Sequence, residues 1–388
     1  MTVLSLIAGS RAVTGRCAVV AYLSVSALAG CSWFSGPTKP PPTALTEIGA
    51  KSLLAPVWNL DSGRAGIGFQ PAVINDSVFA ASSDGRVSRA QAATGKLLWR
   101  TELERPLVTG VGSDGDNVVV AGRDGSLIAL DSVGKQRWSV ATGAEVNSVP
   151  LVSQGSVIVR TSDSRVSAFD LENGKRRWTF QRQAPSLVLR QTVGIALDGA
   201  TVFVGLPGGR LVALNAQNGS VRWEAAVSQP KGSNEIERIA DVVATPMVNG
   251  RDVCAVSFQG RVGCFDAATG RGGWTRDLSS SVGLDLDPRL LVAADDKDHL
   301  HAFSRAGASV WRSDKLAWRG LSRPLTSQLA VIVGDRFGFV HALDRDDGAI
   351  IGRVATDGSA VLAGPVAAGS LAIVQTAGGS LYGIAAAK

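Results

Sequence analysis

The chain has 388 residues, of which 45% are apolar, 19% are charged and 45 are glycine, so it is long enough for a large core and too apolar for a disordered protein. The net charge is +6, and it falls to +4 without Arg11 and Arg16, which lie in a segment that we expect to be removed. This small basic excess argues against a nucleic-acid partner, because such a partner requires a clustered basic face.

The first 30 residues have the organisation of a bacterial signal peptide. They contain no acidic residue, and two arginines precede an apolar run over residues 17–28. A run of about 12 residues suits the core of a signal peptide and is short for a membrane span. The run ends in Leu28-Ala29-Gly30-Cys31, which resembles the lipobox of bacterial lipoproteins. We therefore predict a signal peptide over 1–30 and acylation of Cys31; an ordinary signal peptide with an incidental cysteine is the alternative.

The segment after the signal peptide is predicted to be a lipid anchor and a tether. Each buried CH2 group of an acyl chain contributes about 0.8 kcal/mol, so several chains on Cys31 would hold the protein on a membrane durably. Ser32 follows the cysteine, which in such lipoproteins resembles the sorting pattern for the outer membrane. Residues 31–44 are rich in proline, including Pro40-Pro41-Pro42, and are expected to form an extended spacer.

The remainder, residues 45–388, is built from a repeat of about 40 residues. Seven tryptophans occur at positions 58, 99, 138, 178, 223, 274 and 311, with gaps of 41, 39, 40, 45, 51 and 37 residues. This period suits the four-stranded blades of a β-propeller. In each unit, alternating apolar segments are separated by one turn with Gly and a second turn with Asp or Asn followed by Gly, as at Asp266 and Gly270. We interpret the recurring Asp as bonding to the amides of its own turn.

The units predict an all-β, eight-bladed propeller with four antiparallel strands per blade. Six units end in a tryptophan strand, Gly352 takes that position in the seventh, and the eighth stops after Ile384 without such a strand. The segment Val57-Trp58-Asn59-Leu60 has no unit of its own. We therefore predict that this N-terminal strand completes the C-terminal blade, which removes an exposed sheet edge.

The repeat resembles the pyrroloquinoline-quinone-type propeller motif, most closely at Phe265-Asp266-Ala267-Ala268-Thr269-Gly270 with Trp274. With the lipobox and the chain length, the sequence resembles the BamB family, the propeller lipoproteins of the outer-membrane β-barrel assembly machinery. Two stretches are specific for this family: Leu187-Val188-Leu189-Arg190, and the segment from Ser233 to Val242. The resemblance implies a non-catalytic scaffold in the outer membrane, facing the periplasm.

The resemblance also implies a docking site. Leu187, Leu189, Arg190 and Asp241 match family residues that contact the periplasmic domains of the central barrel protein, BamA; nascent outer-membrane proteins are a further candidate partner. A second family Asp is replaced by Val243. Topology gives independent support, because the two longest gaps place their extra residues in consecutive connections on one face, around 181–192 and 228–244. We expect the four matched residues to form one exposed surface, although insertions without a role are the alternative.

The alternative function is a periplasmic quinoprotein-like dehydrogenase, the enzyme class with a related repeat. Those enzymes carry a vicinal disulfide and a Ca2+ site, whereas Cys254 and Cys264 are ten positions apart here. If Gln259-Gly260 forms a two-residue turn, Cys254 lies opposite Phe265 and the two cysteines point to different faces. Both a cross-strand disulfide and two packed thiols remain open.

The histidines and the nearby acidic residues do not predict a metal site or any cofactor. His301 and His341 hold the same repeat position in neighbouring blades, and such positions diverge radially instead of converging on one ion. His299 lies two positions before His301. Asp295, Asp296 and Asp298 lack the Gly and the distant Glu of an EF-hand. No nucleophile motif or phosphate-binding loop occurs, so no catalytic residue is predicted.

Overall fold

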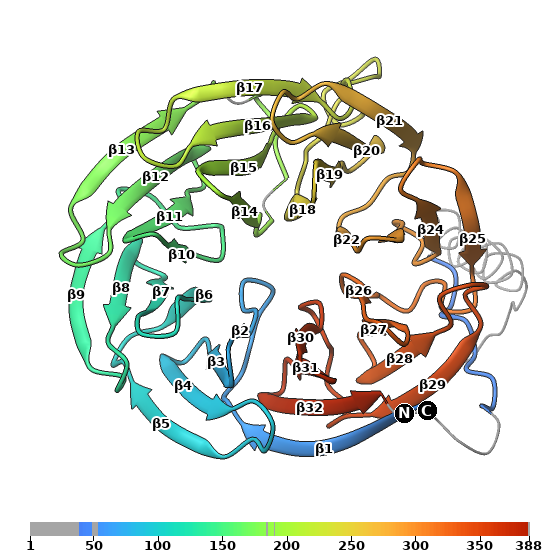
Figure 1. Cartoon of the computed structure of the whole chain (residues 1–388), viewed down its shortest axis with the longest axis horizontal. Coiled ribbons are helices and arrows are strands. Elements are labelled where there is room, and N and C mark those ends of the chain that lie inside the picture. Colours follow the sequence, from blue (N-terminus) through green and yellow to red (C-terminus); the bar gives the residue numbers. More distant parts are fainter. Residues whose placement is uncertain (1–38, 49–52, 184, 190, 387–388) are drawn as a thin grey trace, which may run out of the picture. The chain divides into compact units, whose positions relative to one another are not determined.

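The computed structural model describes residues 39–48, 53–183, 185–189 and 191–386. Within residues 42–388, eight four-stranded antiparallel sheets stand around a ring (Figure 1), which confirms the predicted eight-bladed all-β propeller. In the described residues, no helix is long and apolar enough to cross a membrane.

Seven blades follow the chain order from the centre of the ring outward, and the eighth combines both ends of the propeller. Blade 1 contains β2 (Ala72–Ile74), β3 (Ser77–Ala81), β4 (Arg86–Gln91) and β5 (Leu97–Glu102); blade 2 contains β6 (Leu107–Ser113), β7 (Val118–Gly122), β8 (Ser126–Leu130) and β9 (Gln136–Ala141). Blade 3 contains β10 (Leu151–Ser153), β11 (Ser156–Arg160), β12 (Arg165–Asp170) and β13 (Arg176–Gln181); blade 4 contains β14 (Ile195–Asp198), β15 (Thr201–Leu206), β16 (Arg210–Asn215) and β17 (Val221–Ala226).

The second half of the ring repeats this arrangement. Blade 5 contains β18 (Met247–Asn249), β19 (Asp252–Val256), β20 (Arg261–Asp266) and β21 (Gly272–Asp277); blade 6 contains β22 (Leu284–Leu286), β23 (Leu290–Ala294), β24 (Leu300–Ser304) and β25 (Ser309–Ser313). Blade 7 contains β26 (Leu325–Thr326), β27 (Val331–Gly334), β28 (Phe339–Leu343) and β29 (Ile350–Ala355); blade 8 contains β30 (Val366–Ala368), β31 (Leu371–Gln375), β32 (Ser380–Ala386) and β1 (Leu54–Asp61).

The apolar core lies between the faces of adjacent blades. Strands in the middle of a blade, such as β7, are buried at every position, whereas outer strands such as β5 alternate between exposed and partly buried residues. In one cluster, Phe79 of blade 1 packs with Val120 and Ile128 of blade 2. Because both faces of β7 are covered, its sequence is a continuous apolar run.

The tryptophans of the repeat join each blade to the next. Their indole Nε1 groups donate hydrogen bonds of 2.8 to 3.0 Å to a turn carbonyl of the following blade, in the pairs Trp58 to Ala92, Trp99 to Ser132, Trp138 to Leu171, Trp178 to Ala216, Trp223 to Ala267, Trp274 to Arg305 and Trp311 to Arg345. The turn glycine lies against the ring: a Cβ atom on Gly95 would stand 2.6 Å from the Trp58 ring. This contact explains why Trp and turn Gly recur together.

The turn Asp also acts as predicted. Asp266 Oδ1 accepts hydrogen bonds from the backbone N–H and the hydroxyl of Thr269, at 2.9 and 2.7 Å. The same type of bond joins Asp131 to the backbone of its own turn. These bonds fix the turn that contacts the tryptophan of the preceding blade.

Ring closure by the N-terminal strand is confirmed. Strand β1 lies beside β32 (Figure 1) and pairs with it in antiparallel orientation. In this pairing, Trp58 lies opposite Gly383. The start of β1 also crosses Gly352 of β29, where a Cβ atom would lie 3.1 Å from the backbone nitrogens of Leu53 and Leu54. A tryptophan at position 352 would block this crossing, which explains why the seventh unit lacks it.

The predicted register of the cysteine hairpin is wrong. Ser257 N–H donates to the Arg261 carbonyl at 2.9 Å, so three residues separate this pair instead of two, and Gln259 has a positive φ of 48°. One extra residue shifts the strand register by one, which reverses the face of every side chain. Cys254 therefore lies opposite Cys264, and the two form a disulfide.

The end of the proline-rich segment is attached to blades 6 and 7. Thr43 N–H donates to the Ala317 carbonyl at 2.9 Å, and the Thr43 carbonyl accepts from Arg319 at 3.1 Å. Leu45 packs against the core between these blades. Residues 31–38 of the predicted spacer, Cys31 among them, lie outside the described residues, and Thr43 within the predicted range already contacts the propeller.

Candidate docking surface

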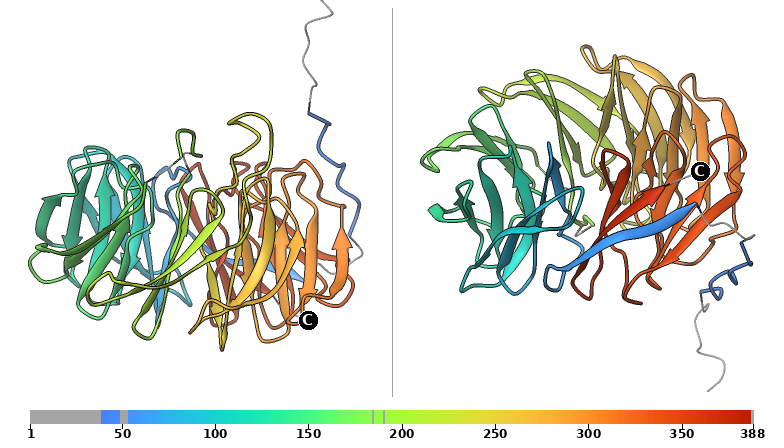
Figure 2. Two further views of the ribbon diagram at one scale, coloured as in Figure 1. Left: turned by 90° about the horizontal axis from the view of Figure 1, so that it is seen from above. Right: turned by 60° about the horizontal axis from the view of Figure 1, so that its bottom comes forward.

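Two long connections define the candidate surface, and both join an outer strand to the inner strand of the next blade. They are the β13–β14 connection (182–194) and the β17–β18 connection (227–246). Figure 2, in its left view, shows both protruding at the same face of the propeller. The hydroxyl of Ser186 donates to Glu235 Oε1 at 3.0 Å, so the two connections are in contact. The predicted continuous surface on adjacent blades is therefore present.

Asp241 connects these loops from below the surface. Its Oδ2 accepts the backbone N–H of Leu189 at 2.8 Å, and its Oδ1 accepts the backbone N–H of Gly208 at 3.0 Å. Gly208 belongs to the turn between β15 and β16. One carboxylate thus joins the first connection, the second connection and a turn of blade 4. Hydrogen bonds to an ionised acceptor are stronger than those between neutral groups, so Asp241 fixes the position of the Leu189 segment.

The prediction that Asp241 belongs to the exposed surface is wrong. The residue is 3% exposed, because both of its oxygens point inward to backbone amides. Arg160, at the end of β11, is also buried, and burial lowers its pKa to about 10 although the Asp241 charge opposes this shift. The Nε of Arg160 has no hydrogen-bond partner among the described residues. The Asp241 charge therefore also compensates a buried cation.

The apolar side chains of the surface come from both connections. Leu187 is 40% exposed and Leu189 is partly buried, whereas Arg190 lies outside the described residues. Ile236 in the second connection is 66% exposed, and the sequence reasoning missed it. Its signal was present, because it is a lone large apolar residue in the polar stretch 231–238. Val243 is buried, so the side chain that replaces the family's second Asp faces the interior.

A compact turn holds Ile236 at its exposed position. Asn234 Oδ1 accepts the Glu237 N–H at 2.9 Å, and Glu237 Oε2 accepts the Ser233 N–H at 2.8 Å. This reciprocal pair resembles the capping box at the start of a helix. Hydrogen bonds from the Ser233 backbone and hydroxyl and from Asn234 hold the pKa of Glu237 below its usual value. The turn therefore presents Ile236 on an ordered loop.

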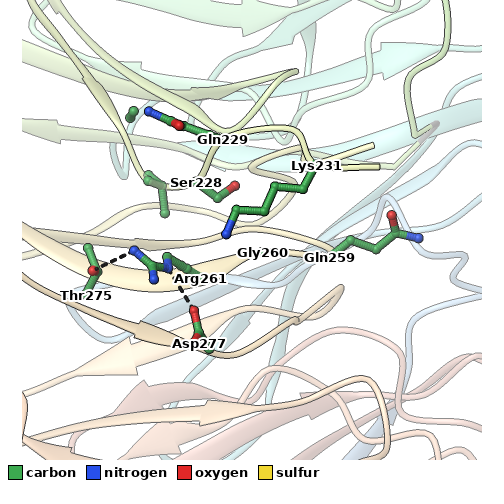
Figure 3. A pocket seen from close by; sticks show the side chains of 10 residues that line it. Ser228, Gln229, Lys231, Gln259, Gly260, Arg261, Thr275 and Asp277 are labelled. Carbon is green, nitrogen blue, oxygen red and sulfur yellow. Dashed lines mark hydrogen bonds and ion pairs between the residues drawn. The ribbon is translucent and has the colours of Figure 1, made fainter. Parts of the chain in front are cut away.

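Two open pockets flank the connections. The first, of about 390 Å³, lies between the start of the second connection and blade 5 (Figure 3). Lys231 and Arg261 line it, and Arg261 Nε pairs with Asp277 Oδ1 at 2.8 Å. The second pocket, of about 420 Å³, lies beside the first connection and is lined by Pro185 and Leu206, among others. Hollows beside exposed apolar loops can receive side chains of a bound protein.

The histidines and neighbouring acidic residues lie outside this surface. His341 is fully buried, and its Nε2 lies 3.1 Å from Asp335 Oδ2. Asp298 accepts the backbone N–H groups of residues 320 and 321, and Asp296 accepts the Ser279 hydroxyl. Asp295 contacts the rings of His299 and His301 instead. The three carboxylates thus serve different partners and do not form one calcium loop.

Known proteins resemble the chain over most of its length. The family model of the outer membrane protein assembly factor BamB matches residues 83–313 and 296–388. The assembly factor BamB of Burkholderia pseudomallei is 43% identical over 88% of this chain and 91% of its own, and that of Bordetella pertussis is 38% identical over 93% and 95%.

Solved structures agree with this result. The crystal structure of BamB from Moraxella catarrhalis superimposes with a TM-score of 0.78 at 30% identity, over 86% of this chain and 99% of its own. A quinohemoprotein alcohol dehydrogenase from Comamonas testosteroni has a TM-score of 0.70 at 15% identity, over 87% and 77%. At that identity the dehydrogenase shares the propeller fold alone.

Proposed function

The chain belongs to the family of the outer membrane protein assembly factor BamB, and on that premise we propose that it is a lipid-anchored scaffold of the outer-membrane β-barrel assembly complex. It faces the periplasm and docks on the periplasmic domains of the central barrel protein, BamA. Relatives matching over most of the chain are named as assembly factors, whereas the dehydrogenases share only the fold, so the protein is not an enzyme.

One observation carries the docking proposal: two adjacent connections present apolar side chains on an ordered framework. Leu187 and Ile236 are exposed, and Asp241 holds the backbone beside them. Exposed leucine and isoleucine side chains gain free energy when a partner covers them. Arg190 contributes to this proposal through the family resemblance, and an Arg beside apolar anchors has the composition of an interface hot spot.

Alanine substitution tests the docking proposal. The variant Leu187→Ala/Leu189→Ala should bind purified periplasmic domains of BamA more weakly by about 1 to 3 kcal/mol, and Arg190→Ala should do likewise. Leu98→Ala is the matched control, because Leu98 is 50% exposed but lies on the outer strand of blade 1. Equal affinities for the wild type and the double variant would show that another face binds the partner.

The anchor is tested separately, through Cys31. We expect Cys31→Ala to move the protein from the outer-membrane fraction to the soluble periplasmic fraction, since the acylated thiol is the proposed anchor. The docking variants provide the control, because they keep Cys31 and should remain in the membrane fraction. Recovery of Cys31→Ala in the outer membrane at wild-type level would contradict the lipoprotein proposal.

A further inference from the structure

The turn between β23 and β24 in blade 6 brings a carboxylate and two imidazoles together. Asp295 Oδ2 lies 2.9 Å from His299 Nδ1 and 3.0 Å from His301 Nε2. One ligand atom from each of the three residues lies within 4.8 Å of the other two. His301 is the second residue of β24 and His299 directly precedes the strand, so the two side chains, two positions apart, point to the same side. The absence of a metal site was predicted from His301 and His341, which lie in neighbouring blades, whereas Asp295, His299 and His301 converge within one turn.

The carboxylate is held in place by the backbone. Asp295 Oδ1 accepts the N–H groups of Lys297 and His299, both at 2.9 Å. The carboxylate is therefore oriented with Oδ2 toward the two rings.

Blade 7 contains the same arrangement with one difference. Asp335 Oδ1 accepts the N–H groups of Phe337 and Phe339, and its Oδ2 faces His341 Nε2. The second partner of this oxygen is the Arg319 guanidinium, whose Nε lies 2.7 Å away. Blade 7 therefore places a permanent cation beside its carboxylate, inside the core. Blade 6 has His299 where blade 7 has Phe339, and Asp295 Oδ2 contacts two imidazoles where Asp335 Oδ2 contacts one imidazole and a guanidinium.

His299 Nδ1 cannot form hydrogen bonds with both of its neighbours at the same time. Arg312 lies 3.0 Å from His299 Nδ1, the same nitrogen that faces Asp295 Oδ2. A ring nitrogen either donates to a carboxylate or accepts from a guanidinium, but it does not do both. A metal ion between Asp295 Oδ2 and His299 Nδ1 needs no proton on either atom and would remove this conflict.

We propose that Asp295, His299 and His301 bind a divalent transition-metal ion of the zinc class. Two imidazole nitrogens and one carboxylate oxygen are ligands typical of Zn2+, at about 2.0 to 2.2 Å, with a fourth position left for water. Mg2+ and Ca2+ prefer oxygen ligands and are not expected to bind. The side chains are 13 to 22% exposed, so an ion can reach them from solvent. Arg312 is exposed and can move aside, although its charge weakens the binding.

Calorimetric zinc titration of the full-length mature protein, purified with a tag that lacks histidine, tests the proposal. The whole chain has only three histidines, so few other imidazoles compete. Loss of even an outer hydrogen-bond partner weakens protein metal sites by about 10- to 100-fold, so His299→Phe should lose at least this much affinity. Blade 7 carries Phe339 at the equivalent position, which makes this substitution compatible with the fold. Arg312→Gln should bind zinc more tightly than the wild type.

Imidazole nitrogen NMR of the wild-type protein gives a measurement that needs no variant. Zinc should shift the signals of His299 and His301 and leave that of the buried His341 unchanged. Three results would overturn the proposal: no zinc binding at millimolar concentration, equal zinc affinity in His299→Phe, or a zinc-dependent shift of His341 alone. Equal affinity in the variant would mean that exposed carboxylates elsewhere bind the ion.

Discussion

Replacement of Asp241 by Asn tests whether the docking surface depends on a buried carboxylate. The substitution keeps the shape of the side chain and removes its charge. Two backbone N–H groups, from Leu189 and Gly208, then face a weaker acceptor, and Arg160 loses its nearby countercharge. The strand pairing within the blades does not involve this side chain, so the fold should persist, but the Leu189 segment should lose its fixed position.

The magnitude follows from these bonds. A hydrogen bond to a charged group contributes about 1.5 to 3 kcal/mol. If the substitution removes one such bond, the ordered conformation of the loop loses that free energy. Binding of the partner must then supply it, and the affinity falls by about 10- to 150-fold. Asp241 is 3% exposed, so salt should screen its interactions little and the loss should persist at high salt.

The assay is the affinity for the periplasmic domains of BamA at about 0.1 M and about 0.5 M salt, where screening differs strongly. Asp277→Asn is the control, because this carboxylate is 86% exposed and any effect of its loss should vanish in high salt. An Asp241→Asn defect that also vanishes in high salt would contradict this prediction, since it would mean that the carboxylate acts as a surface charge. Wild-type affinity of Asp241→Asn at both concentrations would refute it as well.

Three further predictions concern stability. Trp58→Ala should lower the free energy of unfolding by about 3 to 5 kcal/mol, because it opens the contact between blades 8 and 1. The control Val57→Ala, at a 54% exposed position, should change it by less than about 0.5 kcal/mol. Equal shifts of the two variants in thermal unfolding would contradict ring closure. Reduction of the Cys254–Cys264 disulfide, which joins residues 10 positions apart, should lower the free energy of unfolding measured in urea by about 2 to 3 kcal/mol. If a reductant also destabilised the Cys254→Ala/Cys264→Ala variant, the loss would not come from this disulfide. Burial lowers the pKa of His341, although its bond to Asp335 opposes this shift. The unfolded chain therefore takes up a proton that the native state excludes, and the free energy of unfolding should fall as the pH drops below about 6.5. The same decline in the His341→Gln variant would assign the effect to other groups.

The sequence alone determined the architecture, because its signals are local and repeated. A tryptophan and a turn glycine recur with a period near 40, and each pair forms one contact between neighbouring blades. The segment around Trp58 has no unit of its own and the last unit lacks one strand, so the sequence predicted that this segment closes the ring. The glycine at position 352 could not be explained from the sequence. In the structure, the backbone of Leu53 and Leu54 passes too close to it for a larger side chain.

Tertiary structure decided what depends on a one-residue register or on the direction of a side chain. The extra turn residue near Gln259 placed Cys254 opposite Cys264, which no spacing rule distinguishes from the alternative register. Asp241 was expected on the exposed surface because it matches a family contact residue, yet its carboxylate points inward to backbone amides of segments that are distant in the sequence. Asp295 and the two histidines meet for a similar reason: strand alternation places both rings on one face, and only the fold of the turn aims the carboxylate at them.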